Sequence, residues 1–87
     1  MNDIQFEIID KLYFVEPYST LLKEIQVPEN VLKNELKEMI KLGWVQVMQF
    51  DEKYKDYVAT PFFNVDDLHS YYFLATKAGL LNHHTKQ

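Results

Sequence analysis

The 87-residue sequence has no cysteine, no arginine and only two glycines. Without cysteine, the chain cannot form disulfides, zinc–thiolate sites, iron–sulfur clusters or a thiol nucleophile. The two glycines, Gly43 and Gly79, are far apart, so the chain has no glycine-rich loop for a phosphate or a dinucleotide. No segment approaches the roughly 18 uninterrupted apolar residues of a membrane span. We therefore expect a cytoplasmic protein that uses no cofactor.

The chain is acidic, because it has nine lysines and thirteen Asp and Glu residues, which gives a net charge of −4. This balance argues against a protein that coats nucleic acid through its overall charge, although it is compatible with a local basic patch. Hydrophobic residues make up 47% of the sequence and aromatic residues 15%, which is enough for a real core. The length suits one small domain spanning residues 1–87.

The first expected helix covers residues 3 to about 15. Asn2 or Asp3 can cap its start, with Gln5 three residues after Asn2 as a capping box. Pro17 ends it, because proline disfavours helical backbone at the residue before it. Its apolar side chains recur every four residues, at Ile4, Ile8 and Leu12.

Two more helices are expected before Gly43. Ser19 and Thr20 offer an N-cap for a short helix over residues 21–25, which stops before Pro28. Pro28 suits the first position of a third helix, where its missing N–H is not needed. Gly43 is the expected left-handed residue at the end of that helix.

The third helix is amphipathic, with a locally basic solvent face. Its apolar arc contains Leu32, Leu36, Met39 and Ile40, extended by Val31 and Leu42. Its opposite arc contains Asn30, Lys33, Asn34, Lys37 and Lys41, with Glu38 on the edge. This surface therefore has the reverse sign of the whole chain.

The second half of the chain changes to a strand pattern. Residues 44–50 are rich in β-branched and aromatic side chains, and residues 57–60 and 71–75 are expected as further strands. A turn is expected at 51–53 and internal structure within 51–70, including a turn at 64–67. Thr76 can cap a last helix that runs from Lys77 to about His84.

Residues 21–45 resemble the helix-turn-helix of bacterial winged-helix transcriptional regulators of the MarR and PadR type. Leu36, Met39 and Gly43 match the "L-x-x-L-x-x-x-G" that ends the recognition helix in that family. The stretch from Tyr72 to Leu80 is similar to the "Y-x-L-T-x-x-G" that follows the wing. Gln26 stands where the family usually has glycine in the turn, and Pro28 stands where it usually has Ser or Thr.

The resemblance implies an α+β winged helix-turn-helix fold, with three N-terminal helices, a small antiparallel β-wing and a short C-terminal helix. The helix-turn-helix would cover about 19–42 and the wing about 44–75. It also implies a small homodimeric transcriptional regulator that places its third helix in the major groove of double-stranded DNA, where Asn suits adenine edges and Lys suits guanine edges or phosphates. The implied contact residues are Ser19, Thr20, Asn30, Lys33, Asn34, Lys37, Lys41, Lys53 and Lys55.

Two alternatives stay open. The lysines of the third helix can instead pair with Glu29 and Glu38 on an ordinary solvated face, and acidic residues neutralise the wing. The chain could then be a winged-helix module for protein–protein interaction or dimerisation that binds no DNA, which the net acidity and missing arginine favour.

No enzymatic activity and no metal site are expected. Asp66 and Asp67 are adjacent, which does not place two carboxylates across a shared substrate. The three histidines have no ligand spacing with an acidic partner.

The aromatic residues could serve the core or a dimer surface. The expected dimer surface combines the first helix and residues 80–83 with exposed aromatics from Tyr13, Phe14, Tyr71 or Phe62. The expected core contains Ile4, Ile8, Leu12, Leu22, Ile25, Leu32, Leu36, Met39, Ile40, Trp44, Val45, Phe73 and Leu80.

Overall fold

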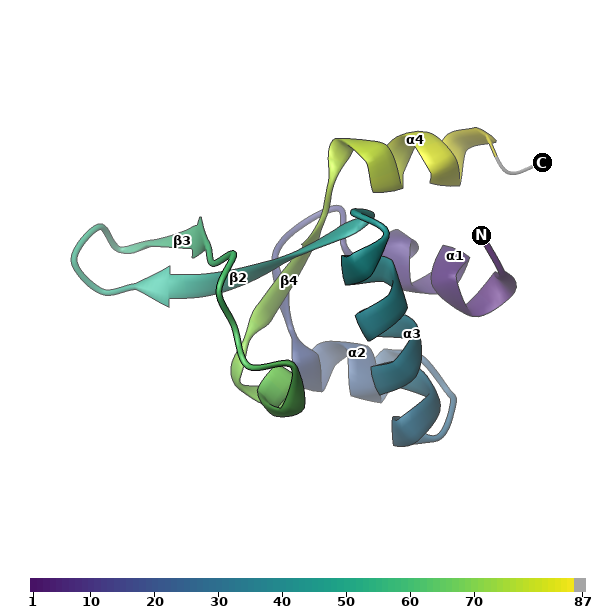
Figure 1. Ribbon diagram of the computed structural model, residues 1–87, viewed down its shortest axis with the longest axis horizontal. Helices are drawn as coiled ribbons and strands as arrows, with labels where there is room; N and C mark the ends of the chain where they lie inside the picture. The colour runs from purple at the N-terminus through teal and green to yellow at the C-terminus, as the bar shows by residue number, and fades with distance from the viewer. Residues whose placement is uncertain (86–87) are drawn as a thin grey trace.

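A computed structural model describes residues 1–85 and shows an α+β fold (Figure 1). Five helical segments and a four-stranded antiparallel sheet make up this part of the chain. In chain order the elements are α1 (Asp3–Lys11), β1 (Glu16–Pro17), α2 (Tyr18–Glu24), α3 (Glu29–Lys41), β2 (Val45–Asp51), β3 (Asp56–Ala59), the 3-10 helix η1 (Val65–Ser70), β4 (Tyr72–Ala75) and α4 (Lys77–Thr85). None of the helices within residues 1–85 is long and apolar enough to cross a membrane.

The start of α1 is fixed by the expected capping box. The Asn2 side chain accepts a hydrogen bond from the Gln5 backbone N–H at 2.8 Å, and the Gln5 side chain accepts one from the Asn2 N–H at 2.9 Å. Both side-chain amides also donate to the Glu35 carboxylate of α3, at 3.2 and 3.1 Å. The capping box therefore also ties α1 to α3.

The end of α1 differs from the prediction, because the helix stops at Lys11 rather than near Val15. The Leu12 carbonyl accepts a hydrogen bond from the Ala75 N–H at 2.9 Å, at the end of β4. Beyond it, Glu16 and Pro17 form β1, which pairs antiparallel with β4. Pairing with a distant strand thus overrides the local helical pattern.

The start of α2 also differs from the prediction. The helix begins at Tyr18, so Ser19 and Thr20 lie in its first turn instead of preceding it. The N-cap residue is Pro17, whose ring has no hydrogen-bonding group and makes no capping bond. Leu21 is buried and Leu22 is 38% exposed, so the expected core position of Leu22 is wrong. One residue is a rotation of 100° around a helix, enough to move a side chain from the core to the surface.

The end of α3 confirms the expected role of Gly43, whose φ is +78°. The Gly43 N–H donates to the Ile40 carbonyl at 3.1 Å and the Trp44 N–H donates to the Met39 carbonyl at 2.9 Å. This pair of bonds is the Schellman arrangement, which satisfies the last carbonyls of the helix. At the other end, Pro28 is the N-cap residue rather than the first helical residue.

The sheet has the strand order β1-β4-β2-β3. β2 pairs with β3 from Met48↔Ala59 to Asp51↔Asp56, and it pairs with β4 from Val45↔Ala75 to Met48↔Tyr72. Figure 1 shows the β2–β3 hairpin projecting away from the helices along the long axis of the molecule.

The segment after β3 contains internal structure, as expected. It forms η1, in place of the simple turn expected at 64–67, and the Asn64 side chain accepts from the Asp66 N–H at 2.9 Å. Leu68 of η1 is fully buried. This segment therefore belongs to the core, and it also passes beside α3 (Figure 1).

The core lies between the helices and one face of the sheet. Ile4, Ile40, Trp44 and Leu80 of the expected core are half-buried against it. The other expected residues apart from Leu22 are buried: Ile8, Leu12, Ile25, Leu32, Leu36, Met39, Val45 and Phe73. The sequence prediction of the core is thus confirmed except at Leu22.

The last helix begins where the sequence predicts. The Thr76 hydroxyl accepts a hydrogen bond from the Gly79 N–H at 3.0 Å, which caps α4. Gly79 packs directly on the backbone of Trp44, whose carbonyl also accepts from the Thr76 N–H at 3.0 Å. Close contact between two backbones therefore joins α4 to the start of β2.

Candidate nucleic-acid interface

The third helix is held firmly on one side and is open to solvent on the other. Leu32, Leu36 and Met39 are fully buried, which fixes the rotation of α3 about its own axis. On the opposite side Asn30 and Asn34 are exposed. Of the α3 lysines, Lys41 is exposed, whereas Lys33 and Lys37 are half-buried.

The lysines of α3 differ in their partners. Lys33 forms an ion pair with Glu29, with 3.8 Å between Nζ and Oε2. Lys37 and Lys41 form no ion pair with any residue from 1 to 85. The expected pairing of Lys33 with Glu29 is therefore confirmed. The lysines of this helix without an ion pair are Lys37 and Lys41, and the exposed Glu38 on the same helix has no ion pair within residues 1–85 either.

Glu29 also binds the neighbouring helix. Its Oε2 accepts a hydrogen bond of 3.0 Å from the Tyr18 hydroxyl of α2, so one carboxylate links α2, the start of α3 and Lys33. Burial raises the pKa of Tyr18 far above its usual value, and the hydrogen bond to Glu29 and its negative charge raise it further. Tyr18 therefore remains a hydroxyl donor throughout the neutral range.

This link predicts a loss of stability in alkali. Folding raises the pKa of Tyr18 above its value of about 10 in the unfolded chain. The Tyr18 hydroxyl therefore contributes fully to the free energy of unfolding below about pH 10, and this contribution falls as the pH rises further. We expect the free energy of unfolding of the Tyr18→Phe variant to fall less steeply above pH 10, by up to about 1.4 kcal/mol per pH unit. Urea unfolding at several pH values measures this, with Tyr54→Phe on the hairpin as the matched control. Identical slopes for wild type and Tyr18→Phe would contradict it.

The two lysines expected to act from the wing lie on the hairpin turn. Lys55 pairs with Glu52 at 3.3 Å, and Lys53 lies over the Tyr54 ring at 5.5 Å from its centre. The Asp51 carboxylate accepts from the Lys53 N–H at 2.8 Å, which shapes the turn. Figure 1 places this turn at the far end of the molecule from α3, so the structure does not bring the two groups of lysines together.

The remaining two residues expected to contact DNA, Ser19 and Thr20, lie on α2. Ser19 is exposed and Thr20 is half-buried. The predicted site thus lies on three elements: the outer face of α3, the first turn of α2 and the distant hairpin turn.

His83 in α4 has a structural role that the sequence pattern does not predict. His83 is buried, its Nε2 lies 2.9 Å from Asp10 Oδ1 and its Nδ1 lies 3.2 Å from the Tyr13 hydroxyl. Its ring also stacks on Phe6 at 4.0 Å. The His83 side chain therefore packs between α4 and α1 and is not exposed on the expected dimer surface.

No sequence signal marks this histidine, because its partners are 70 and 73 residues away in the chain. Within residues 1–85, no group of three His, Asp or Glu side chains could hold a metal ion.

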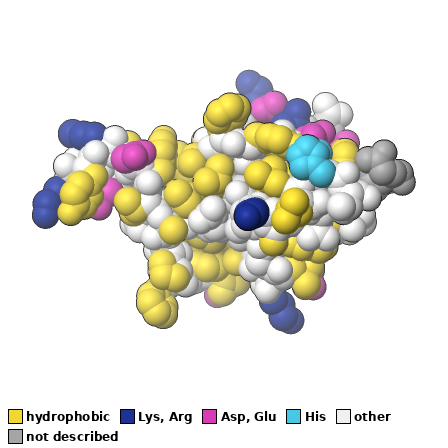
Figure 2. All heavy atoms as spheres, turned by 90° about the horizontal axis from the view of Figure 1, so that it is seen from above, with side chains coloured by type: hydrophobic (Ala, Val, Ile, Leu, Met, Phe, Trp, Pro, Cys, Tyr) yellow, Lys and Arg dark blue, Asp and Glu magenta, His cyan; other side chains and the backbone are white. Residues whose placement is uncertain are grey.

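Several aromatic side chains remain at the surface. Phe62 is 92% exposed and Phe14 is 78% exposed. On the sheet, Tyr57 packs edge-on against both Phe50 and Tyr72. Figure 2 shows hydrophobic side chains gathered between the hairpin and α4. The aromatic residues are therefore divided between the two expected locations: Phe73 is in the core, and Phe62 is at the surface.

No known protein family, curated protein or solved structure gives a significant match to this chain.

Proposed function

We propose that the chain is a winged helix-turn-helix domain, with α2 and α3 as the helix-turn-helix and the β2–β3 hairpin as the wing. Three observations support this: the order of the elements, the place of β4 between β1 and β2, and the Schellman end of α3 at Gly43. The α2–α3 turn needs no left-handed residue, because Gly43 and Lys55 are the only residues from 1 to 85 with positive φ. Gln26 is therefore compatible with the fold.

We further propose that α3 binds duplex DNA in the major groove and that the protein is a small transcriptional regulator. The observation that carries this proposal is the outer face of α3. There two exposed asparagines accompany two lysines without an ion pair, on a helix that the core holds rigidly. Asparagine can bind an adenine edge with two hydrogen bonds, and lysine can bind guanine or phosphate. The helix therefore carries groups for both base contacts and backbone contacts.

A single domain of this kind contacts few phosphates, so we propose a homodimer that binds two half-sites about one helical turn apart. The segment that follows α1, residues 12–15, adjoins the C-terminal helix α4, since the Tyr13 ring packs edge-on against His84. Phe14 and Leu81 are exposed in these two segments. A sedimentation mass near twice the 10.4 kDa of one chain supports this dimer, and a mass near 10.4 kDa removes the two-half-site mechanism.

Selection among random duplexes tests the proposed reading of bases. We expect wild type to enrich a short motif. The variant Asn30→Ala/Asn34→Ala should lose that enrichment while it still binds duplex DNA through Lys37 and Lys41, because phosphate contacts carry no sequence information. Equal enrichment by wild type and this variant would contradict base contact by the two asparagines.

A protein-binding module without DNA affinity is the second candidate. The observation that favours it is the exposure of Phe62 and Phe14 on an acidic chain, because aromatic residues are enriched in interfaces. Failure of the protein to bind any duplex at low salt would select this candidate.

A further inference from the structure

A groove runs between the C-terminal half of α3 and the segment that leads from β3 to η1. It consists of two hollows of about 230 and 330 Å³ that share Ile40 and Phe63. We call this feature the α3 groove and define it by Lys37, Ile40, Lys41, Pro61, Phe63 and Val65. Ile40 and Phe63 line both hollows, so the hollows adjoin at these two residues.

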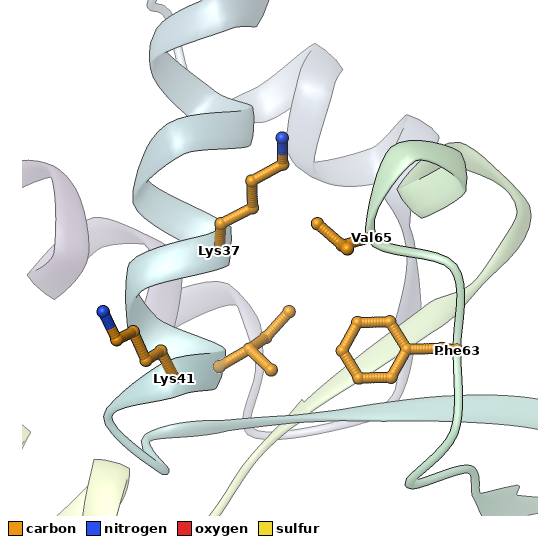
Figure 3. Close-up of a pocket in the computed structure, with 5 residues that line it drawn as sticks. Lys37, Lys41, Phe63 and Val65 are labelled. Atoms are coloured by element: carbon orange, nitrogen blue, oxygen red, sulfur yellow. The ribbon is translucent and has the colours of Figure 1, made fainter.

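The floor of the α3 groove is apolar. Ile40 and Phe63 are half-buried and pack against the core, and Val65 is exposed. Figure 3 shows the Phe63 ring and the Val65 side chain pointing from their segment toward α3. An apolar chain in the groove would therefore remove Ile40, Phe63 and Val65 together from water.

The charged side chains that line the groove are all positive. Lys37 and Lys41 line the first hollow, and no carboxylate lies among the residues that line either hollow. In Figure 3 the Lys37 side chain extends toward the segment that carries Val65, whereas the Lys41 amino group points away from it. Lys37 makes no ion pair within residues 1–85, so its ammonium group is available to an anion at the edge of the apolar floor.

We propose that the α3 groove binds an amphipathic carboxylate, a molecule with an unbranched apolar chain and one anionic head. The chain lies along Ile40 and Phe63, and the carboxylate accepts a hydrogen bond from Lys37. Charge complementarity selects this class of ligand, because a neutral chain leaves Lys37 unpaired and a cationic chain is repelled by it. The overall charge of −4 opposes any anion, so local contacts with the groove must supply the affinity.

Carboxylate binding in the α3 groove goes beyond the proposed function, and it does not depend on whether the protein binds DNA. One consequence does rest on the DNA proposal: Lys37 belongs to both surfaces, so a carboxylate bound to Lys37 competes with a phosphate. We then expect decanoate to weaken duplex binding. If decanoate binds the groove but does not weaken duplex binding, Lys37 is not shared between the two ligands. Binding to the groove itself is measured directly, in the absence of DNA.

Titration of the full chain with decanoate, followed through the methyl resonances of Ile40 and Val65, tests the proposal. Decanol is the matched neutral ligand, kept below its aqueous solubility. Decyltrimethylammonium is the matched cation, and it and decanoate are kept below their critical micelle concentrations. We expect saturable shifts at both residues with decanoate, and binding about tenfold weaker with decanol, because decanol has no charged head to pair with the Lys37 ammonium group.

Two variants distinguish the loss of the Lys37 charge from a general effect of removing a lysine. Lys37→Gln should weaken decanoate binding about tenfold and leave decanol unchanged, because the charge is lost and the floor is kept. Lys77→Gln, an equal change at an exposed lysine of α4, should leave both unchanged. The absence of saturable shifts at Ile40 and Val65, equal affinity for decanoate and decanol, or equal weakening by both variants would overturn the proposal.

Discussion

The Gly79→Ala variant should be destabilised by about 3 kcal/mol or more, which is a large share of the stability of a domain this size. A Cβ atom at this position would lie 2.1 Å from the Trp44 carbonyl oxygen and 3.0 Å from its carbon. These are backbone atoms at the start of β2, so they cannot move aside as a flexible side chain could. Relief requires α4 to shift, which strains the bond from the Thr76 N–H to the Trp44 carbonyl.

Gly43→Ala is the matched control, because it makes the same chemical change at the other glycine. A Cβ atom at Gly43 meets nothing within 4 Å, but the φ of +78° is unfavourable for alanine. We expect a cost of only about 1–2 kcal/mol there, and most of it should be recovered in Gly43→Asn, since asparagine tolerates this conformation. Thermal unfolding followed by circular dichroism measures all three variants. Equal losses in Gly79→Ala and Gly43→Ala would contradict the close contact of α4 with β2.

The Phe73→Ala variant should lose about 3–5 kcal/mol. Phe73 is fully buried on the central strand β4, which pairs with both β1 and β2, and its ring lies 6.4 Å from that of Tyr18. Removal of the ring leaves a cavity where the sheet meets the helices.

The same truncation at Phe62 serves as the control, because that side chain is 92% exposed. We expect Phe62→Ala to change the free energy of unfolding by less than about 0.5 kcal/mol. Urea unfolding of both variants provides the comparison. A Phe73→Ala loss below about 1 kcal/mol would show that β4 is not at the centre of the core.

The sequence predicts the parts of this fold that local chemistry determines. The capping box of Asn2 and Gln5, the left-handed Gly43 and the Thr76 cap all act over a few residues, and each is present. The buried face of α3 also follows from helical periodicity alone.

Other features depend on distant segments that meet in the fold. The end of α1 depends on a hydrogen bond from Ala75, and the burial of His83 depends on Asp10 and Tyr13. The backbone contact of Gly79 with Trp44 is of the same kind. Neither periodicity nor spacing encodes such partners, so one sequence alone cannot predict them.

The candidate site also combines features that local sequence predicts with features that depend on distant segments. Periodicity places Asn30, Asn34, Lys37 and Lys41 on the outer face of one helix, and charge spacing predicts the pairing of Lys33 with Glu29. The α3 groove was not predictable, because its far wall comes from Phe63 and Val65, more than twenty residues along the chain.

The central claim, that α3 contacts duplex DNA, is tested most directly by the salt dependence of duplex binding. Each phosphate neutralised contributes about −0.9 to the slope of log affinity against log salt concentration. We therefore expect Lys37→Gln/Lys41→Gln to flatten the slope by about 1.8. Lys11→Gln/Lys77→Gln changes the net charge equally, on α1 and α4, and should leave the slope unchanged. Absence of binding at low salt, or equal slopes for the two double variants, would contradict the claim.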